Sequence, residues 1–306
     1  MSIDLTPLTA NSFSRRFTLE NLDIRGQVVR LDDAWRDLMQ GRDYPPDVTR
    51  YFGELATIAV LVGSGLKHPG RITLQIQSGT EKNGDTTANF LAKRAARLVV
   101  IDCSHTLGLR GMASAATDEG RAQYGQFSDW VGEATLAMTV ANSDSTQMYQ
   151  SLVPVSGLTV AECFEHYFDQ SEQLPTHLWL AATPESAGAL MLQKLPGADT
   201  RDRDGWARVE MLASSVTDAE LIAAPVEVLL QRLFANEDVR LYAPNPVHSD
   251  CARDEEKVRA VLRGLGRAEL ETTLAEYGEV IVKDDMANQE YRFDAEAIAA
   301  LFGGVE

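Results

Sequence analysis

Residues that commonly bind metal ions gather towards the C-terminal end of the chain. His248 and Cys251 are separated by two residues, which is the spacing of one half of a structural zinc site. Asp284 and Asp285 are the candidates for the other half. A structural zinc site takes four ligands and favours thiolates. The sequence leaves two alternatives, a mixed Cys-His-Asp metal site or a solvated loop with an inert thiol, and the shortage of thiolates favours the loop.

Cys103 and His105 form a second candidate for chemistry, just after a predicted strand. A nucleophilic Cys–His pair needs the imidazole within hydrogen-bond reach and a third group that orients it, and the sequence shows neither. The alternative is a turn at the end of the strand. Gly63-Ser64-Gly65 lacks the Lys-Ser/Thr ending of a phosphate loop and follows a helical pattern, which indicates a helix end. Without a convergent acid, base or nucleophile set, we expect a protein that is not an enzyme.

Composition and charge narrow the class of protein. The chain has 306 residues, of which 44% are hydrophobic, so it can bury a sizeable core in two or three structural units. A formal net charge of −17 and a pI near 4.7 argue against nucleic acid as a partner, because nucleic-acid binding needs clustered Lys and Arg. The most apolar run, Leu55 to Leu66, is too short to span a membrane, and residues 1–16 lack the apolar core of a signal peptide. Three widely spaced cysteines predict no disulfide framework. We expect a cytoplasmic protein without membrane partners.

The first part of the chain, residues 1–196, mixes strand and helix patterns. Its strands cluster between helices instead of alternating strictly with them, which favours an α+β fold over a doubly wound sheet. Cys163 recurs with aromatic residues at helical spacing, so we expect its thiol to pack in a core. The predicted strands are Arg71–Gln77, Leu98–Ile101, Thr135–Val140 and Leu178–Ala182, and the predicted helices are Asp47–Leu61 and Val160–Gln170.

The rest of the chain divides into a helical stretch and a small mixed part. Pro196-Gly197 and a charged run break the pattern, and residues 197–238 then read as helices, with a capping box at Thr217 and Glu220. Residues 239–306 begin with a short strand at Val239 to Tyr242. They continue with a helix that starts at Asp254 to Glu256, a second helix that ends at Gly278, a hairpin of residues 279–283 and 290–293, and a last helix capped by Asp294.

The most specific segments of the chain are two stretches near the end of its first part. Residues 165–176 read Glu-His-Tyr-Phe-Asp-Gln-Ser-Glu-Gln-Leu-Pro-Thr, and residues 187–196 read Ala-Gly-Ala-Leu-Met-Leu-Gln-Lys-Leu-Pro. Together with residues 70–77, Arg110-Gly111 and the outline of residues 242–293, in the same order and spacing, they resemble the 33-kDa heat-shock protein family, the redox-regulated chaperone holdases of bacteria. The resemblance covers nearly the whole chain.

The resemblance implies an α+β architecture in three parts. These would be an N-terminal chaperone core at residues 1–196, a helical linker at 197–238 and a small C-terminal α+β domain at 239–306. In the family, a Cys-x-Cys pair and a Cys-x-x-Cys pair hold zinc in the C-terminal domain. Oxidation forms disulfides, releases zinc, unfolds the linker and exposes a surface that holds unfolded clients, commonly in a dimer. The resemblance therefore also implies unfolded client proteins and a second copy of the chain as partners.

Carried onto this sequence, the first pair of the family's zinc ligands falls at Cys251 and Arg253, and the second at Asp284 and Ala287. Three of the four thiolates are missing, so we expect neither zinc nor a thiol switch. Arg253 and Asp284 carry opposite charges at two of these positions, and a direct contact between them is an alternative that the sequence leaves open. Stability would then rest either on docking against the rest of the protein or on apolar burial by Val258, Val261, Leu262, Leu270, Leu274, Val280, Val282, Tyr291 and Phe293.

The sequence and the resemblance lead to one function and one alternative. We expect an ATP-independent holdase of the stress response that binds unfolded proteins and prevents their aggregation. Its activity would be constitutive, or controlled by heat- or acid-driven loosening of the helices between Trp206 and Phe234. The alternative is a dedicated protein-interaction module on the same fold that has lost general chaperone activity. The client-binding surface cannot be recognised, because buried and client-facing apolar stripes look alike in sequence.

Overall fold

Residues 2–3, 11–77, 98–114, 126–132, 135–143, 148–155 and 157–303 are described in the computed structural model of the chain. The chain folds as two units, residues 1–249 and 250–306. The predicted third part begins earlier, at residue 239, whereas β11 (Val239–Pro246) pairs with β2 (Phe13–Leu19) and so belongs to the first unit. The prediction of three parts with separate roles stays a prediction. Within the described ranges, no helix is long and apolar enough to cross a membrane.

Two sheets form the framework of the first unit. Sheet A has the strand order β1-β11-β2-β3-β10-β9, and sheet B has the order β12-β6-β5-β4-β7-β8. Neighbouring strands are antiparallel except in the pairs β1–β11 and β12–β6. The bounds of the other strands are β1 Ser2–Ile3, β3 Ile24–Leu31, β4 Gly70–Gln77, β5 Leu98–Ser104, β6 Gly108–Ser114, β7 Thr135–Asn142, β8 Met148–Val153, β9 Thr176–Ala182, β10 Ala187–Lys194 and β12 His248–Ser249.

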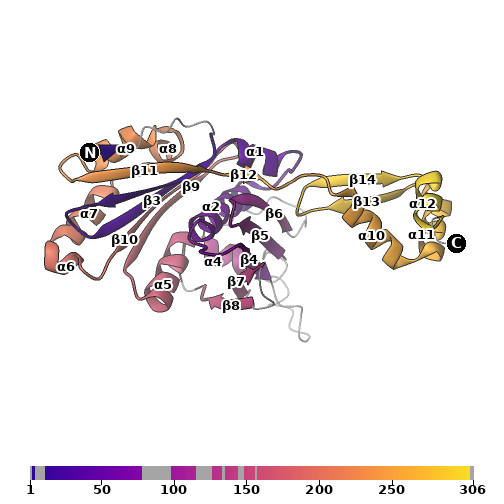
Figure 1. Ribbon diagram of the computed structural model, residues 1–306, viewed down its shortest axis with the longest axis horizontal. Helices are drawn as coiled ribbons and strands as arrows, with labels where there is room; N and C mark the ends of the chain where they lie inside the picture. The colour runs from indigo at the N-terminus through magenta and orange to yellow at the C-terminus, as the bar shows by residue number, and fades with distance from the viewer. Residues whose placement is uncertain are drawn as a thin grey trace. The chain divides into compact units, whose positions relative to one another are not determined.

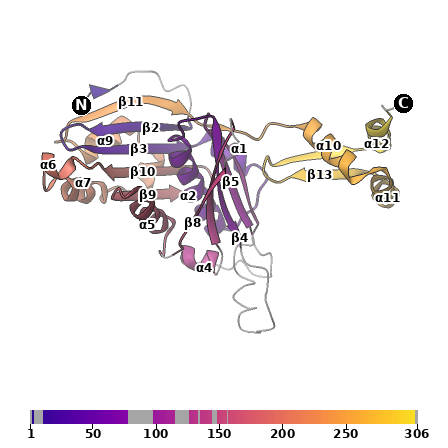
Figure 2. The ribbon, with the colours of Figure 1, turned by 60° about the horizontal axis from the view of Figure 1, so that its bottom comes forward.

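The helix α2 (Pro46–Gly63) lies between the two sheets, as Figures 1 and 2 show. It begins with Pro46 in its first turn, where the missing N–H costs no hydrogen bond, and it buries residues on all of its faces. A side chain on Gly53 would collide with Ala182 of β9, and one on Gly63 would collide with the thiol of Cys103 on β5. The two glycines therefore let one helix approach both sheets closely.

Short helices surround this framework. α1 (Asp33–Met39) packs near β12 and β6, and α5 (Val160–Glu172) packs on β9. α5 starts with a capping box in which the Thr159 side chain accepts from the Glu162 N–H and the Glu162 side chain accepts from the Thr159 N–H. Two further short helices are α4 (Phe127–Val131) and, at the start of the predicted linker, α6 (Ala198–Arg201).

The predicted linker helices cover the face of sheet A that is opposite α2. They are α7 (Gly205–Ala213), α8 (Asp218–Ala223) and α9 (Val226–Leu233), and their apolar residues share one core with those of β2, β3, β10 and β11. Gly188 of β10 lies so close to the Leu221 carbonyl that a Cβ would meet its oxygen at 2.6 Å. The linker helices are therefore an integral layer of the first unit.

The second unit builds a small core of its own. It contains α10 (Glu255–Leu265), α11 (Arg267–Tyr277), the hairpin of β13 (Val280–Asp284) and β14 (Gln289–Phe293), and α12 (Ala295–Phe302). Asp254 caps α10, Asp294 caps α12, and Gly278 ends α11 with a positive φ of 81°. These caps and the hairpin confirm the pattern predicted for residues 254–294.

Most of the predicted elements of the first unit are confirmed, with their ends moved by a few residues. α2, α5, β4, β5, β7 and β9 occur where helices and strands were predicted, and α2 ends at the Gly63-Ser64-Gly65 segment. Both hydrogen bonds of the Thr217–Glu220 capping box are present. The mixed α+β fold class is thus confirmed, whereas β2, β3 and α1 were not predicted because their sequences lack a clear period.

Candidate functional site

The four positions that the resemblance assigns to zinc ligands all lie in the second unit, and each has a different contact. The Cys251 carbonyl accepts a hydrogen bond from Gln289 Nε2 at 3.0 Å. Arg253 stacks its guanidinium over the Tyr291 ring, 4.5 Å from the centroid. At the β13–β14 turn, Asp284 Oδ1 accepts from the Ala287 N–H at 3.1 Å, and Ala287 is 5% exposed. The carboxylate therefore closes the turn from within.

Arg253 and Asp284 do not make the direct contact that the sequence left open. Within the described residues, the cation nearest to Asp284 is Lys257, whose Nζ lies 4.0 Å from Oδ2, and no ion pair joins Asp284 to Arg253. The Arg253 guanidinium lies over the Tyr291 ring instead, because a cation is favoured over the face of an aromatic ring.

Tyr291 connects the start of α10 to the hairpin. Its side chain is buried, and its hydroxyl accepts the Asp254 N–H at 2.7 Å. The Asp254 side chain in turn accepts the Lys257 N–H and so caps α10. One aromatic residue thus holds the segment that follows Cys251, which is the role a metal would have in a stapled module.

Apolar burial in the second unit follows the prediction at most positions. Val261 is the exception, since it is 55% exposed on α10. Leu274 and Val282 are partly buried at the edge of the core, and α12 adds two buried residues. The buried core consists of Val258, Leu262, Leu270, Val280, Tyr291, Phe293, Ile298 and Leu301.

The residues present do not fit a zinc ion. Across the described residues, no group of three or more His, Cys, Asp or Glu side chains is arranged to hold a metal. His248 belongs to β12 of the first unit, where it pairs with Gly108, whereas Cys251, Asp284 and Asp285 belong to the second unit. A single thiolate without a paired second one is a poor donor set for structural zinc.

The other two cysteines are buried in the first unit. Cys103 packs against α2 at Gly63, and burial, with a further contribution from Asp102, raises the pKa of its thiol to about 12. Cys163 is buried on α5 and confirms the prediction of a core thiol. His105 Nδ1 accepts the Gly70 N–H at 3.4 Å in the turn after β5. These contacts favour the strand-end turn over a catalytic pair.

Two buried arginines hold the linker helices on sheet A. Arg15 of β2 forms an ion pair with Glu227 of α9, and its Nε donates to the Tyr242 carbonyl at 2.7 Å. Arg30 of β3 donates from Nη2 to the Leu221 carbonyl of α8 at 3.1 Å. Burial lowers the pKa of Arg30, and the nearby Asp32 and Glu227 carboxylates oppose this shift. Charged groups with partners on α8 and α9 thus lie inside the interface of linker and sheet.

His177 of β9 forms a third contact with the linker. Its ring stacks on Trp206 of α7 at 5.4 Å between centroids, and its two nitrogens face Glu165 at 3.5 Å and Glu210 at 3.2 Å. The hydrogen bond to Glu165 raises the pKa of His177, burial opposes this, and the charges of Glu165 and Glu210 add to it. The contact is therefore strongest when the imidazole is protonated.

The exposed apolar residues of the first unit include two groups on regular elements. Met148, Tyr149 and Leu152 project from β8, which is an edge strand of sheet B, and their exposed fractions are 64–69%. Met211 and Val228 are exposed on the linker helices α7 and α9. Exposed apolar groups of this size mark candidate surfaces for binding other chains.

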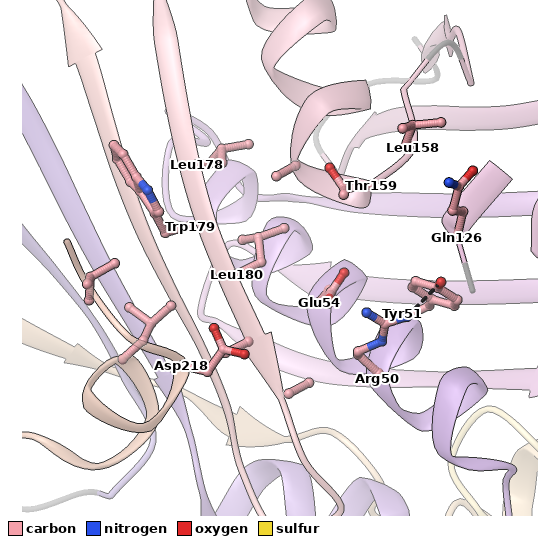
Figure 3. A pocket seen from close by; sticks show the side chains of 15 residues that line it. Arg50, Tyr51, Glu54, Gln126, Leu158, Thr159, Leu178, Trp179, Leu180 and Asp218 are labelled. Atoms are coloured by element: carbon pink, nitrogen blue, oxygen red, sulfur yellow. Dashed lines mark hydrogen bonds between the residues drawn. The ribbon is translucent and has the colours of Figure 1, made fainter. Parts of the chain in front are cut away.

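A pocket of about 510 Å³ opens beside β9. Figure 3 shows Leu178, Trp179 and Leu180 of β9 on one side of it, with Arg50, Tyr51 and Glu54 of α2 opposite. The start of α5 contributes Leu158 and Thr159, and the start of α8 contributes Asp218. Burial raises the pKa of Glu54 to about 7, with Arg50 opposing the shift and Asp218 adding to it. The lining of the pocket thus combines apolar side chains with polar and charged ones, and Glu54 is the most deeply buried of its carboxyl groups.

Comparison with known proteins supports one family. The sequence profile of the Hsp33 protein family matches residues 13–294. The chain belongs to the Hsp33 family. A 33 kDa chaperonin of Methylobacillus flagellatus is 35% identical over 289 residues, which are 94% of this chain and 93% of that protein. A 33 kDa chaperonin of Pseudomonas aeruginosa is 33% identical over 296 residues, or 95% and 94% of the two chains.

A solved structure shows the same fold. The crystal structure of a 33 kDa chaperonin from Thermotoga maritima superposes with a TM-score of 0.72, at 20% identity, over 96% of this chain and 98% of that one. The predicted family is confirmed, and Hsp33 is a family of chaperones, not of enzymes.

Sequence reasoning missed the contacts that join distant segments. His177, Arg15 and Arg30 were not singled out, because their partners lie far away in sequence, on the linker helices. Glu54 was not noticed either, although a lone acidic residue in the apolar run of α2 was a signal that could have found it.

Replacing Tyr291 by Phe should weaken the second unit. The substitution keeps the ring but leaves the Asp254 N–H without its acceptor, at a cost of about 1–2 kcal/mol. Hydrogen–deuterium exchange of the full chain should then speed up in peptides from α10 and β14 and stay unchanged in the first unit. Tyr277→Phe is the control, since Tyr277 is exposed. Equal exchange in the two variants would contradict this role of Tyr291.

The His177 contact should make linker docking weaker as the pH rises. Because the folded-state pKa of His177 is raised, its stabilisation is complete below its ordinary value of 6.5 and is lost as the pH rises through the raised value. Urea unfolding of the wild type and of His177→Asn between pH 5.5 and 8.5 measures this. The difference in the free energy of unfolding between the two proteins should shrink with rising pH. It should stay below about 1 kcal/mol, because the His177 side chain is partly solvated.

His166→Asn, on the exposed face of α5, is the control for this titration. The pKa values of Asp202, bonded to Arg208, and of Glu220, bonded to Thr217, are lowered, so acid should weaken these two linker contacts as the pH falls below the ordinary range of carboxyl groups. A His177→Asn difference that grows with pH would contradict the assignment.

Proposed function

We propose that the chain is an ATP-independent holdase that binds unfolded polypeptides and prevents their aggregation without zinc or thiol switching. The observation that carries the proposal is near full-length membership in a family whose relatives are named 33 kDa chaperonin. Exposed apolar residues on β8 and on the linker helices support it, since a holdase needs apolar surface for its clients. A cytoplasmic location and a homodimer belong to the same proposal.

The loss of the switch rests on the residue types at the four ligand positions. Cys251 is the one thiolate among Cys251, Arg253, Asp284 and Ala287, and the noncovalent contacts of the other three support a unit that folds without metal. Cys103 and Cys163 are buried, and a thiol whose pKa is near 12 is a poor nucleophile towards peroxide at neutral pH. The proposal assigns regulation, where there is any, to docking of the linker helices.

Zinc content tests the missing site directly. The purified wild-type chain should contain far less than one zinc per molecule and should keep its thermal stability in a chelator. The triple variant Arg253→Cys, Asp284→Cys, Ala287→Cys restores the family's two pairs around Cys251 and should bind zinc stoichiometrically, because such sites contribute about 10–16 kcal/mol of apparent binding free energy. Stoichiometric zinc in the wild type that is lost in Cys251→Ser would refute the proposal.

Suppression of aggregation tests the function. The full chain should keep a thermally unfolding client enzyme soluble, and light scattering should be equally low with and without prior peroxide treatment. Cys251→Ser should act like the wild type. Two results would count against the proposal: no suppression under either condition, or a strong peroxide requirement that disappears in Cys251→Ser.

A further inference from the structure

β9 is the outer strand of sheet A, and among the described residues no further strand pairs with its far edge. On its inner side β9 pairs with β10. The hydrogen bonds Lys194 N to Pro175 O, at 2.9 Å, and Thr183 N to Ser186 O, at 2.8 Å, continue this ladder at both ends. Because residues of an antiparallel pair alternate between bonded and non-bonded positions, residues 177, 179 and 181 bond to β10, and residues 178, 180 and 182 direct their backbone groups outwards.

One of the outward groups already has a partner. The Leu178 N–H donates to Glu165 Oε1 of α5 at 2.7 Å. This bond confirms that Leu178 directs its backbone groups away from β10. The Leu178 carbonyl, both backbone groups of Leu180 and the Ala182 N–H have no hydrogen-bond partner among the described residues. A row of unpaired backbone groups on an edge strand is a template for another strand.

The pocket beside β9 follows this free edge. All five residues from Leu178 to Ala182 line it, with α2 and the start of α5 on one face of the sheet and the start of α8 on the other. A strand added at the edge would direct its side chains alternately to these two faces. Its volume of about 510 Å³ is in the usual range of ligand sites.

Glu54 gives the pocket a chemical preference. Its side chain is buried, with the residue 8% exposed, and its carboxylate has no hydrogen-bond or ion-pair partner in the described part of the chain. Arg50, one turn away, is engaged elsewhere: its guanidinium lies over the Tyr51 ring at 4.4 Å and 3.9 Å from Asp47. A carboxyl group whose pKa burial raises to about 7 is only partly charged at neutral pH, and a ligand that brings a cation would favour its ionised form.

We propose that the free edge of β9 is a client-binding site, where an extended segment of an unfolded chain adds as a strand beside Leu180 and directs a Lys or Arg side chain to Glu54. The inference rests on the proposed holdase function and names where and how a client binds. Main-chain pairing suits a holdase because it does not depend on the client's sequence. A second copy of this chain fits less well, since edge-to-edge pairing would bring two unpaired Glu54 carboxylates together in a protein of net charge −17.

The test uses the full chain and a fluorescent peptide, Ser-Val-Thr-Val-Lys-Val-Thr-Val-Ser. Leu180→Pro removes the outward N–H without removing a bond to β10, and Leu180→Ala is its matched control because it loses the same side chain but keeps the N–H. Fluorescence anisotropy should show affinity at least about tenfold lower for Leu180→Pro than for Leu180→Ala. Equal affinities in the two folded variants would overturn the proposal.

Glu54→Gln tests the charge preference. It should weaken binding of the lysine peptide at least about tenfold and leave a norleucine-substituted peptide unchanged or bound more tightly. Glu185→Gln, in the exposed β9–β10 turn, is the charge-matched control and should bind both peptides as the wild type does. A Glu54→Gln variant that binds the lysine peptide like the control would overturn the assignment of Glu54.

A third experiment uses the wild-type protein with modified peptides, so it does not depend on whether Leu180→Pro folds. Two modified peptides are compared: one is N-methylated at every valine, and the other at every residue between the valines. One of them should bind clearly less well, because only one of these two sets of amides faces β9. Equal binding of the two would overturn the strand model. So would a Leu180→Pro variant that changes from dimer to monomer with peptide binding unaltered, which would assign the edge to a second copy.

Client aggregation separates this inference from the proposed function. If the wild type does not suppress aggregation, the holdase proposal fails. If the wild type, Leu180→Ala and Leu180→Pro all suppress it equally, the holdase proposal stands and the β9 site is wrong. Suppression by the wild type and Leu180→Ala that is reduced in Leu180→Pro supports both.

Discussion

The burial of α2 between sheets A and B is the constraint on which the first unit depends. A helix that is apolar on nearly every face is stable only when protein surrounds it, and Gly53 and Gly63 allow the two sheets to come close enough. Since α2 occupies one face of sheet A, the opposite face needs another cover, which α7, α8 and α9 supply. The position of α2 also puts Glu54 beside β9. The position of α2 thus leaves the opposite face of sheet A to the linker helices, and it places a carboxyl group next to the edge strand β9.

The sequence predicted features that depend on neighbours along the chain. The end of α2, the capping box at Thr217 and the β13–β14 hairpin come from local hydrogen bonds and from periodic burial, which a single sequence displays. The resemblance then identified the family from motifs at the end of α5 and in β10.

Features that depend on distant partners could not be predicted in the same way. The strand at residue 239 was recognised, but its partner β2 lies more than two hundred residues earlier, so the strand was placed in the wrong structural unit. For the same reason the sequence could not decide on the Arg253–Asp284 contact, because two neighbours, Tyr291 and Lys257, lie closer to these charges. The isolation of the Glu54 carboxylate is also a tertiary property, visible only when α5, β9 and α8 are in place.

The second unit shows how a small fold can be held together without a dominant bond. The positions that the resemblance assigns to zinc ligands contribute a stacking contact, a turn-closing hydrogen bond and a buried methyl group, each worth on the order of 1 kcal/mol. Together they are far weaker than a structural zinc. The apolar core of eight buried residues, among them Tyr291 and Phe293, must therefore supply most of the stability.

The two buried arginines of sheet A have a consequence for kinetics. Undocking the linker helices would separate Arg15 from Glu227 and Arg30 from the Leu221 carbonyl before water could fully solvate either guanidinium, so the intermediate is costly. Release should then be a slow, concerted event with a high activation enthalpy. Rates of such opening rise about 3–6-fold for each 10 °C. Heat alone would in this way open the linker, at a rate that depends steeply on temperature.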